Sequence, residues 1–414
     1  MTAALLALNE RTFASLKRHR NYRLFFTGQV ISVSGTWMQN VALAWLVVEL
    51  TSSPIAVGLL AFCRFIPFTV FGLFAGVVAD RIDNRRLVIG TQTVSMIFSA
   101  TFAVLVIGGL ETVWIVYVLA ILSSTALVFD APGRHALTFQ MVGRDELPNA
   151  VALNASLFNA SRVVGPAFAG VLIAAFGVGL CFAINTVTFL AVLAGLLMMR
   201  REELVPLDPT ERPPTVMRAI GEGFAWAWRS PDARLVLLIV TVVSTVGFNF
   251  HVILPLLASD TLNTGPEVFG ILSACFGGGA LVGALLSATL GRASWKALVF
   301  GTGGFSVCLL VLAPMTTVWV CAILLFCTGV CFTLWTSNAS SILQLRAPNH
   351  LRGRVVSLYL WAFAGLAPLG GLLAGWLCAV GGTELSFAVA GSTGLLMAAV
   401  AARRLSVRRA AALA

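Results

Sequence analysis

The chain has 414 residues, of which 58% are apolar and only 11% are charged, and its mean hydropathy is +0.93. This composition excludes a set of soluble domains, because so few charges would not keep a chain of this size in solution, and it indicates folding in a lipid bilayer. The net charge of +10 also suggests a nucleic-acid partner, but the positions of the basic residues make that partner unnecessary.

Apolar runs follow one another along almost the whole chain, and most of them reach the roughly 20 residues that a membrane-spanning helix needs. Residues 1–20 lack the pattern of a cleaved signal peptide, so we expect a cytosolic tail. Dividing the chain at charged and Pro/Gly breaks predicts an all-α integral membrane protein with twelve transmembrane helices: residues 24–49, 54–79, 87–109, 112–131, 148–176, 178–199, 234–258, 266–290, 297–315, 317–341, 353–380 and 383–402.

The basic residues fall on alternate connections between these spans. If the N-terminus is in the cytosol, every Lys and Arg except Arg64 and Arg162 lies in a tail or on a cytosolic loop. This bias predicts that both termini are cytoplasmic. The opposite loops carry acidic residues instead, namely Glu49, Glu111, Asp260, Glu267 and Glu384.

The second half of the chain repeats the first at an offset of about 204 to 212 residues. Because six spans are an even number, both copies enter the membrane from the same side, which is typical of parallel repeats. We therefore expect an N-terminal six-helix bundle in 1–199, a cytoplasmic linker in 200–233 and a C-terminal six-helix bundle in 234–414. Matching pairs are Pro54 with Pro266, Gly58 with Gly270, and Arg81 with Arg292.

The linker contains a predicted amphipathic helix. Val216, Ile220, Phe224 and Trp228 share one helical face, and basic residues flank it. A helix of this kind is typical of segments that lie on a membrane surface, so we expect it on the inner leaflet.

Small residues at a spacing of four predict close helix packing within the bundles. Close packing of this kind would let two bundles slide past each other as a central site opens to one side and then the other. The three G-x-x-x-G edges are Gly72/Gly76, Gly279/Gly283 and Gly371/Gly375.

The loop 76-GVVADRIDNRR-86 resembles the signature between the second and third spans of the major facilitator superfamily, with Asp83 where the common pattern has Gly. Other stretches are similar to the exporter group around the enterobactin exporter and macrolide efflux proteins, a group of transmembrane secretion effectors. They are 35-GTWMQNVALAWLVVELTSSPIAVG-58, 130-DAPGRHALTFQMVGRDELPNAVALN-154, 162-RVVGPAFAG-170, 222-EGFAWAWRSP-231 and 351-LRGRVVSLY-359. The resemblance covers essentially the full chain. It implies a major facilitator fold and a monomeric secondary exporter of small organic molecules in the bacterial inner membrane, commonly driven by proton exchange.

The resemblance also implies a conformational latch on the cytosolic side, in which Asp80 contacts the start of the eleventh span near Arg352. The alternative is a solvated basic loop that only sets topology. Gly165, Pro166 and Gly170 match a motif of antiporting members, and the alternative there is an ordinary helix kink. The expected latch residues are Gly76, Asp80, Arg81, Arg85, Arg86, Asp130 and Arg134.

Arg64 and Arg162 are expected roughly halfway through their spans, where an ionised group is costly and usually faces a cavity or a partner. No Asp or Glu lies at comparable depth, so the two arginines favour an anionic substrate over a cationic drug. Arg162 alternatively braces the fifth span. Further candidates for substrate binding, each alternatively a packing residue, are Trp37, Gln39, Asn40, Asn159, Asn249, Trp335, Asn338 and Trp361.

Proton coupling needs a group that titrates within reach of both sides of the membrane. His251 has a suitable intrinsic pKa, and Glu49 and Asp130 are candidates at the two rims of the membrane. The alternative for His251 is a hydrogen-bonded contact between helices.

Other classes of protein lack their motifs in this sequence. There is no G-K-[ST] phosphate loop, no H-E-x-x-H and no G-x-S-x-G, and the eight cysteines lie within predicted spans as packing residues. We therefore expect no enzyme activity, no metal and no cofactor. The predicted function is secondary export of a siderophore-like or other anionic metabolite, or of a drug, by alternating access. The alternatives are a polyspecific pump for cationic or neutral drugs and, less favoured, a symporting importer.

Overall fold

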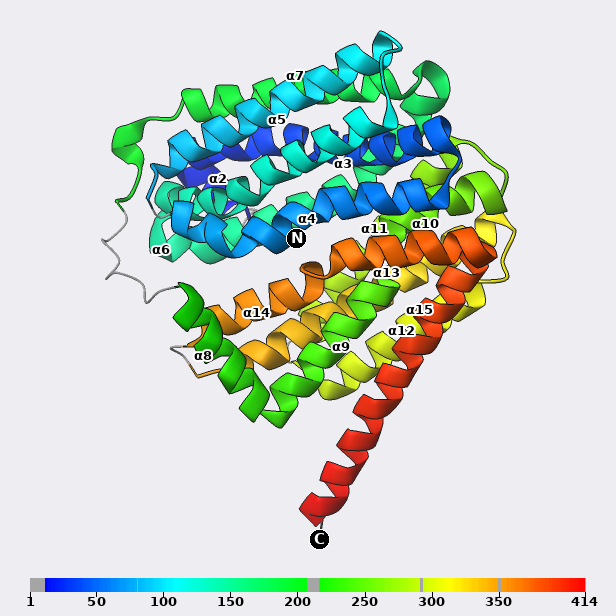
Figure 1. Ribbon diagram of the computed structural model, residues 1–414. Helices are drawn as coiled ribbons and strands as arrows, with labels where there is room; N and C mark the ends of the chain where they lie inside the picture. The colour runs from blue at the N-terminus through cyan, green and yellow to red at the C-terminus, as the bar shows by residue number, and fades with distance from the viewer. Residues whose placement is uncertain (1–11, 80, 207–215, 291–292, 349–350, 414) are drawn as a thin grey trace, which may run out of the picture. The chain divides into compact units, whose positions relative to one another are not determined.

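The computed structural model describes residues 12–79, 81–206, 216–290, 293–348 and 351–413 (Figure 1). Every regular element in these ranges is a helix, and ten of the helices there are long and apolar enough to cross a membrane. The longest of these ten is interrupted by non-helical backbone at Gly143, and another by Gly381 and Gly382. The all-helical membrane fold is confirmed, and the count of twelve spans stays a prediction.

Many large apolar side chains are exposed on the helices. Trp114 is 70% exposed, Phe300 76% and Trp319 72%. In water such a surface would drive aggregation, whereas in a bilayer it contacts the lipid chains and the backbone polar groups are satisfied inside each helix.

The chain folds into two compact units. Unit 1 comprises Met1–Ala42 and Val70–Pro213, and unit 2 comprises Leu43–Thr69 and Pro214–Ala414. The boundaries between the units fall inside the first two long helices, α3 (Arg20–Thr51) and α4 (Pro54–Ala79).

The two units differ from the division expected from the sequence in the placement of residues 43–69. This segment belongs to unit 2, whereas the sequence predicted it in the N-terminal bundle. In unit 2 it is held by close packing of α4 against α15 (Ala367–Leu413), because a Cβ placed on Gly58 would lie 2.8 Å from the carbonyl oxygen of Gly371. Glycines on both helices therefore allow an approach that larger side chains would prevent. The assignment of six spans to each half of the chain stays a prediction.

Unit 1 is built from helices that pack along α5, which lies beside both α6 and α7 (Figure 1). The connection expected at 132–147 is helical on both sides of Gly143, whose φ of 71° supplies the turn. Besides the first part of α3 and the last part of α4, the helices of unit 1 are α2 (Ala14–Arg18), α5 (Asn84–Ile107), α6 (Val113–Phe176), α7 (Val178–Leu197) and the short 3-10 helix η1 (Arg201–Glu203).

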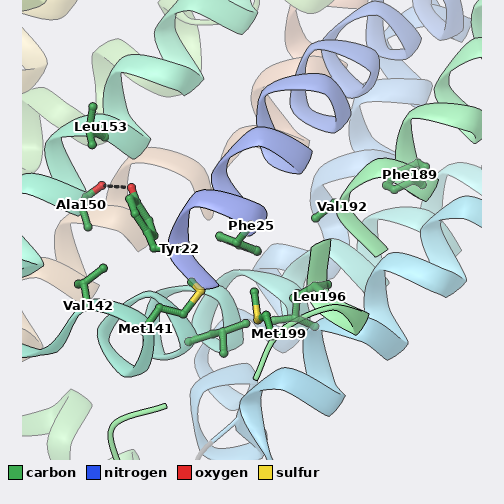
Figure 2. Close-up of a cluster of buried hydrophobic side chains, with 12 residues drawn as sticks. Tyr22, Phe25, Met141, Val142, Ala150, Leu153, Phe189, Val192, Leu196 and Met199 are labelled. Atoms are coloured by element: carbon green, nitrogen blue, oxygen red, sulfur yellow. Dashed lines mark hydrogen bonds between the residues drawn. The ribbon is translucent and has the colours of Figure 1, made fainter. Parts of the chain in front are cut away.

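Figure 2 shows the apolar core of unit 1 around Tyr22 and Phe25, neither of which is exposed. The Tyr22 hydroxyl donates a hydrogen bond of 2.9 Å to the carbonyl oxygen of Ala150. A buried phenol needs such a partner, so this bond joins α3 to α6 within the core.

Unit 2 contains the remaining helices. In it α13 packs against α11 and α12, and α15 packs against α9 and α12. These helices are α8 (Val216–Arg229), α9 (Pro231–Gly247), α10 (Phe250–Leu256), the π-helix η2 (Leu257–Thr261), α11 (Pro266–Leu290), α12 (Trp295–Leu312), α13 (Val318–Arg346), α14 (Arg352–Ala364) and α15.

Close approach between α11 and α13 depends on glycine. A Cβ on Gly279 would lie 1.9 Å from the carbonyl oxygen of Phe326, and one on Gly283 would lie 2.5 Å from that of Val330. Two of the three expected G-x-x-x-G edges therefore make close contacts, this one and that of Gly371 and Gly375. At Gly72 and Gly76 a Cβ would meet no atom of the described chain within 4 Å.

The span expected at 234–258 is discontinuous. α9 ends at Gly247, Phe248 and Asn249 leave the helical conformation, and α10 begins at Phe250. Non-helical backbone at membrane depth is tolerated where it is buried in protein or lines a cavity, so this break marks a region to consider for binding.

Candidate functional site

The predicted site residues divide between the two units. Unit 1 contains the described latch residues and the antiport-motif residues. It also contains those substrate candidates whose residue numbers lie below 43 or between 70 and 213. Unit 2 contains Arg64, His251, Glu49 and the remaining substrate candidates.

Asp130 is the centre of a buried polar network in unit 1. One carboxylate oxygen accepts hydrogen bonds from the Thr91 hydroxyl at 2.7 Å and from the Gln92 amide at 2.9 Å. The other pairs with the Arg134 guanidinium, whose Nε lies 2.9 Å away, and Arg134 also donates to Gln29. The carboxylate is 1% exposed. The network ties α3, α5 and α6 together and satisfies the buried charge.

The other latch residues have separate surroundings. The buried Arg85 guanidinium donates to the carbonyl oxygens of Leu196 at 2.8 Å and Leu197 at 3.2 Å, at the C-terminal end of α7. A cation at a helix C-terminus is favourable, so Arg85 fixes α5 to α7. Gly76 is half-buried on α4, Arg81 and Arg86 are exposed, and Asp80 lies outside the described residues.

The expected kink motif lies in α6, and Gly165, Pro166 and Gly170 are all buried. A Cβ on Gly165 would lie 2.5 Å from the Cβ of Trp37 and 2.8 Å from the carbonyl oxygen of Ser34. This glycine therefore lets α6 approach α3 closely, so one role of the motif is to permit close packing of these two helices.

Near that approach, Arg162 stacks on an aromatic ring. Its guanidinium carbon lies 5.2 Å from the centre of the Trp37 ring, a cation–π geometry. Close by, the Ser34 and Ser161 hydroxyls are 3.1 Å apart. The two substrate candidates Arg162 and Trp37 are thus brought together in unit 1.

The other unit 1 candidates make contacts within the protein. The Gln39 side-chain oxygen accepts from the Ser99 hydroxyl at 2.7 Å and from the Asn185 amide at 2.6 Å. Asn159 donates to the Ala155 carbonyl of its own helix at 3.0 Å, and Asn40 is half-buried on α3. Gln39 therefore joins three helices, which is a packing role.

In unit 2 the structure brings Phe65 of α4 against His251 of α10. The centre of the imidazole ring lies 5.0 Å from that of Phe65, the residue after Arg64. The buried His251 Nε2 has no hydrogen-bond partner in the described part of the chain. The helix contact expected as the alternative for His251 is therefore a ring contact.

A cluster of aromatic side chains surrounds the break between α9 and α10. Trp335 is its one member that the sequence had identified as a candidate. The Phe248 and Phe332 rings are stacked with their centres 4.5 Å apart, and Phe363 lies 5.4 Å from Phe248. The fully buried Trp335 lies 5.9 Å from Phe332. The residues come from separate helices and the break, so only the three-dimensional structure assembles them.

The remaining candidates in unit 2 differ in exposure. Asn249 and Asn338 are buried and donate to carbonyls of their own segments, and Asn338 also accepts from the Ser294 amide at 2.9 Å. Trp361 is 39% exposed on α14. Glu49 is exposed at the end of α3 and accepts from the Trp45 indole at 2.8 Å.

The linker helix α8 presents aromatic side chains to its surroundings. Phe224 is 53% exposed and Trp228 62%, with their rings stacked 5.8 Å apart. The Arg354 guanidinium pairs with Glu222 and joins α8 to α14, a contact that sequence analysis missed. The side chains of Val216 and Ile220 lie outside what the structure describes.

The long apolar helices define a multi-pass membrane protein. The family model for transmembrane secretion effectors, a family of the major facilitator superfamily, matches residues 10–414. The chain therefore belongs to this family, as its motifs predicted. The family and the named relatives are transporters and not enzymes.

Curated relatives match over most of their length. The chain is 24% identical to the staphyloferrin A transporter of Staphylococcus aureus, over 89% of this chain and 92% of the relative. It is 24% identical to macrolide efflux protein A of Streptococcus pyogenes, over 83% and 86%. It is 28% identical to the multidrug efflux pump Tap of Mycolicibacterium fortuitum, over 89% and 91%.

Solved structures support the same fold. The nucleoside transporter NupG matches with a TM-score of 0.72 and 12% identity, over 93% of this chain and 98% of that one. A bacterial homologue of the human lysosomal transporter Spinster matches with a TM-score of 0.68 and 13% identity, over 93% and 95%. At these identities the likeness concerns the fold alone.

Proposed function

We propose that the chain is a secondary exporter of small organic molecules in the bacterial cytoplasmic membrane, with both termini in the cytosol. The observation that carries this proposal is the family match over residues 10–414, together with relatives named for efflux or for a siderophore. The two bundles would alternate access to a central site, with α8 on the inner leaflet and the monomer as the transporting unit.

An anionic substrate is the favoured class. Arg64 and Arg162 are half-buried, and neither the described part of α4 nor residues 147–176 of α6 contain a carboxylate at that depth. A cation inside the membrane is retained at a cost, which a bound anion offsets. The cation–π contact of Arg162 with Trp37 also supports its bracing role.

A polyspecific drug pump is the second candidate. The aromatic cluster around Phe248, Phe332 and Phe363 offers faces on which flat apolar molecules stack, and two relatives are named for macrolide or multidrug efflux. A symporting importer is less favoured, because the three curated relatives are named for efflux or for a siderophore.

Proton antiport is the proposed driving force, with His251, Glu49 and Asp130 as the candidate groups. Asp130 is held by Thr91, Gln92 and Arg134, so its protonation would release that network. The latch proposal keeps Asp80 as the contact to the start of α14 when the carrier faces outward.

Efflux from loaded cells tests the proposed function. Cells that express the chain are loaded with an anionic chelator, a macrolide or a cationic dye, and retention is followed with and without a protonophore. We expect export of the anionic compound, stopped by the protonophore and reduced in Arg64→Ala and Asp80→Asn. Equal retention of all three compounds with and without the chain would contradict the exporter proposal, and export unaffected by Arg64→Ala would contradict the anion class.

A further inference from the structure

A basic cavity lies at one end of unit 1, where α2 is followed by the start of α3 and the chain leaves the end of α7. Its volume is about 320 Å³. Three guanidinium groups line it against a single carboxylate among the described residues, so its lining has an excess of positive charge. All of the lining residues belong to unit 1, and none of them was a candidate in the sequence. They are Arg18, His19, Arg20, Asn21, Met141, Arg200 and Glu203.

A buried asparagine joins the two segments that form this cavity. The Asn21 amide donates to the Arg200 carbonyl oxygen at 2.8 Å, and its side-chain oxygen accepts from the Arg200 backbone N–H at 3.0 Å. Asn21 is only 2% exposed. The Arg20 guanidinium donates to the Met198 carbonyl oxygen at 3.1 Å. The fold therefore brings Arg20 and Arg200, which are far apart in the sequence, to one cavity.

Nearby acidic side chains compensate only part of the positive charge. The Glu203 carboxylate lies 3.1 Å from the Arg200 guanidinium, and Glu146 pairs with Arg18. Arg20 has no carboxylate partner among the described residues, and its bond to a carbonyl oxygen uses one of the five N–H donors of a guanidinium. The N-terminal end of α3 adds partial positive charge at the same place. The cavity is therefore suited to an anion.

Apolar side chains beside the cavity favour a lipid over a soluble anion. Leu197 is 64% exposed and Met198 58%, at the end of α7. In a bilayer, exposed side chains of this kind contact the acyl chains. Because the Met198 carbonyl oxygen is the group that Arg20 binds, this apolar surface adjoins the basic cavity. A phospholipid, which carries a phosphate and acyl chains in one molecule, matches both surfaces.

We propose that this cavity binds the phosphate of an anionic phospholipid, of the kind of phosphatidylglycerol. Arg20 and Arg200 donate to the phosphate oxygens, for which the planar guanidinium is well suited, and the acyl chains lie along Leu197 and Met198. Basic pockets on the cytosolic side of membrane proteins bind anionic headgroups, which agrees with the cytosolic position expected for this end of the chain. The site goes beyond the proposed function and does not depend on which molecule is exported.

Binding of dioleoylphosphatidylglycerol and dioleoylphosphatidylcholine, which differ only in the headgroup, tests the site. The full chain is purified in an uncharged detergent, and native mass spectrometry gives the Kd of the first bound lipid of each kind. We expect phosphatidylglycerol to bind at least about tenfold more tightly, because the cavity attracts the phosphate and repels the choline cation. Glycerol 3-phosphate, which lacks the acyl chains, should bind at least about tenfold more weakly than phosphatidylglycerol.

Charge changes of opposite sign separate this site from general damage to the fold. Arg20→Gln and Arg200→Gln should each weaken phosphatidylglycerol binding about fivefold, the effect of one basic residue near an anionic lipid surface. Glu203→Gln removes the carboxylate from the lining and should tighten binding by a similar factor, which a damaged protein would not show. Arg144→Gln removes an exposed charge of unit 1 outside the cavity and should leave the affinity unchanged. Melting temperatures report whether each variant is folded.

The outcomes decide both the site and its occupant. Equal affinity for the two lipids, or an unchanged preference in folded Arg20→Gln and Arg200→Gln, would overturn the proposal. Glycerol 3-phosphate binding as tight as that of phosphatidylglycerol would overturn the lipid as occupant and assign the cavity to a soluble phosphate compound. A phosphatidylglycerol preference that the arginine variants lose and Glu203→Gln strengthens supports the site. None of these results involves efflux, so failure here leaves the exporter proposal in place.

Discussion

The surroundings of Asp130 in unit 1 and the break between α9 and α10 in unit 2 differ in how the protein holds their central polar groups. Asp130 is bound by Thr91, Gln92 and Arg134. Near the break, by contrast, the buried atoms His251 Nε2 and Trp335 Nε1 lack a partner in the described chain. In the first region the protein satisfies the Asp130 carboxylate, although Gln29 Nε2 beside it has no partner among the described residues, and the network acts as a brace between helices. The second has polar groups and aromatic faces that a ligand can engage.

The strongest test of the brace is loss of its carboxylate. Asp130→Ala leaves the Arg134 charge largely buried without its partner, so we expect the free energy of unfolding to fall by about 3–5 kcal/mol. The measurement is thermal or denaturant unfolding of the purified chain in detergent. Asp83→Ala, at the exposed N-cap of α5, is the control and should cost only about 1 kcal/mol. Similar losses for the two variants would show that the Asp130 network does not brace unit 1.

The aromatic region depends on helices that approach closely, which a single methyl group tests. Gly279→Ala places a Cβ against the Phe326 backbone, so α11 and α13 must separate, at a cost of about 1–3 kcal/mol. Gly72→Ala meets open space and should be neutral or slightly stabilising, because alanine favours the helix. The melting temperatures of the two variants give the comparison directly. A stable Gly279→Ala variant would contradict the packing account.

One pair of matched substitutions compares the polar groups of the two regions. Thr91→Val removes a hydrogen bond to the Asp130 carboxylate and should cost about 1.5–3 kcal/mol. Thr245→Val, next to the break, removes a buried hydroxyl that has no partner in the described chain, and should change stability by less than about 0.5 kcal/mol. Unfolding of the two variants under one condition is the measurement. Equal costs would remove the distinction between the regions.

The smallest expected effect concerns transport by the aromatic cluster. Phe363→Ala deletes a ring that contacts Phe248 and Phe332, and we expect export of an aromatic drug to fall about threefold to tenfold, as the loss of aromatic contacts worth about 0.5–1.5 kcal/mol implies. Phe300→Ala changes a ring that is 76% exposed on α12 and serves as the control. The measurement is the efflux rate of each of the two variants at equal expression. Equal rates for both variants would assign the cluster to packing alone.

Much of the fold was predictable because the bilayer imposes simple requirements. A spanning helix must be long and apolar, and Lys and Arg remain on one side, so the apolar runs and the basic loops predicted the helical membrane fold. The family motifs predicted the transporter class. Internal breaks were harder to predict. Phe248 and Asn249 lie inside an apolar run long enough for one spanning helix, yet the backbone leaves the helix there.

The sequence identified individual residues of the candidate sites, but it did not predict which residues lie together. Arg64 and Arg162 were identified by their depth in apolar spans, and Asp130 and Arg134 by the family resemblance. Their partners were not, because Thr91, Gln92 and Gln29 are ordinary polar residues in the sequence. The hydrogen bonds of Gln39 with Ser99 and Asn185 were not predictable either, and its place in a substrate site stays a prediction.

By itself, the sequence determined that the chain is an all-helical membrane protein of the transmembrane secretion effector family, since length, hydropathy and loop charge are local properties of the chain. Only the tertiary structure decided that segment 43–69 belongs to unit 2, that the Phe65 ring packs against His251, and that aromatic rings from several helices surround the break before α10. Each of these depends on which faces of distant helices meet. Helix contacts inside a membrane are set by small residues and individual polar bonds, and a G-x-x-x-G spacing indicates that a helix can pack closely without indicating which helix it meets.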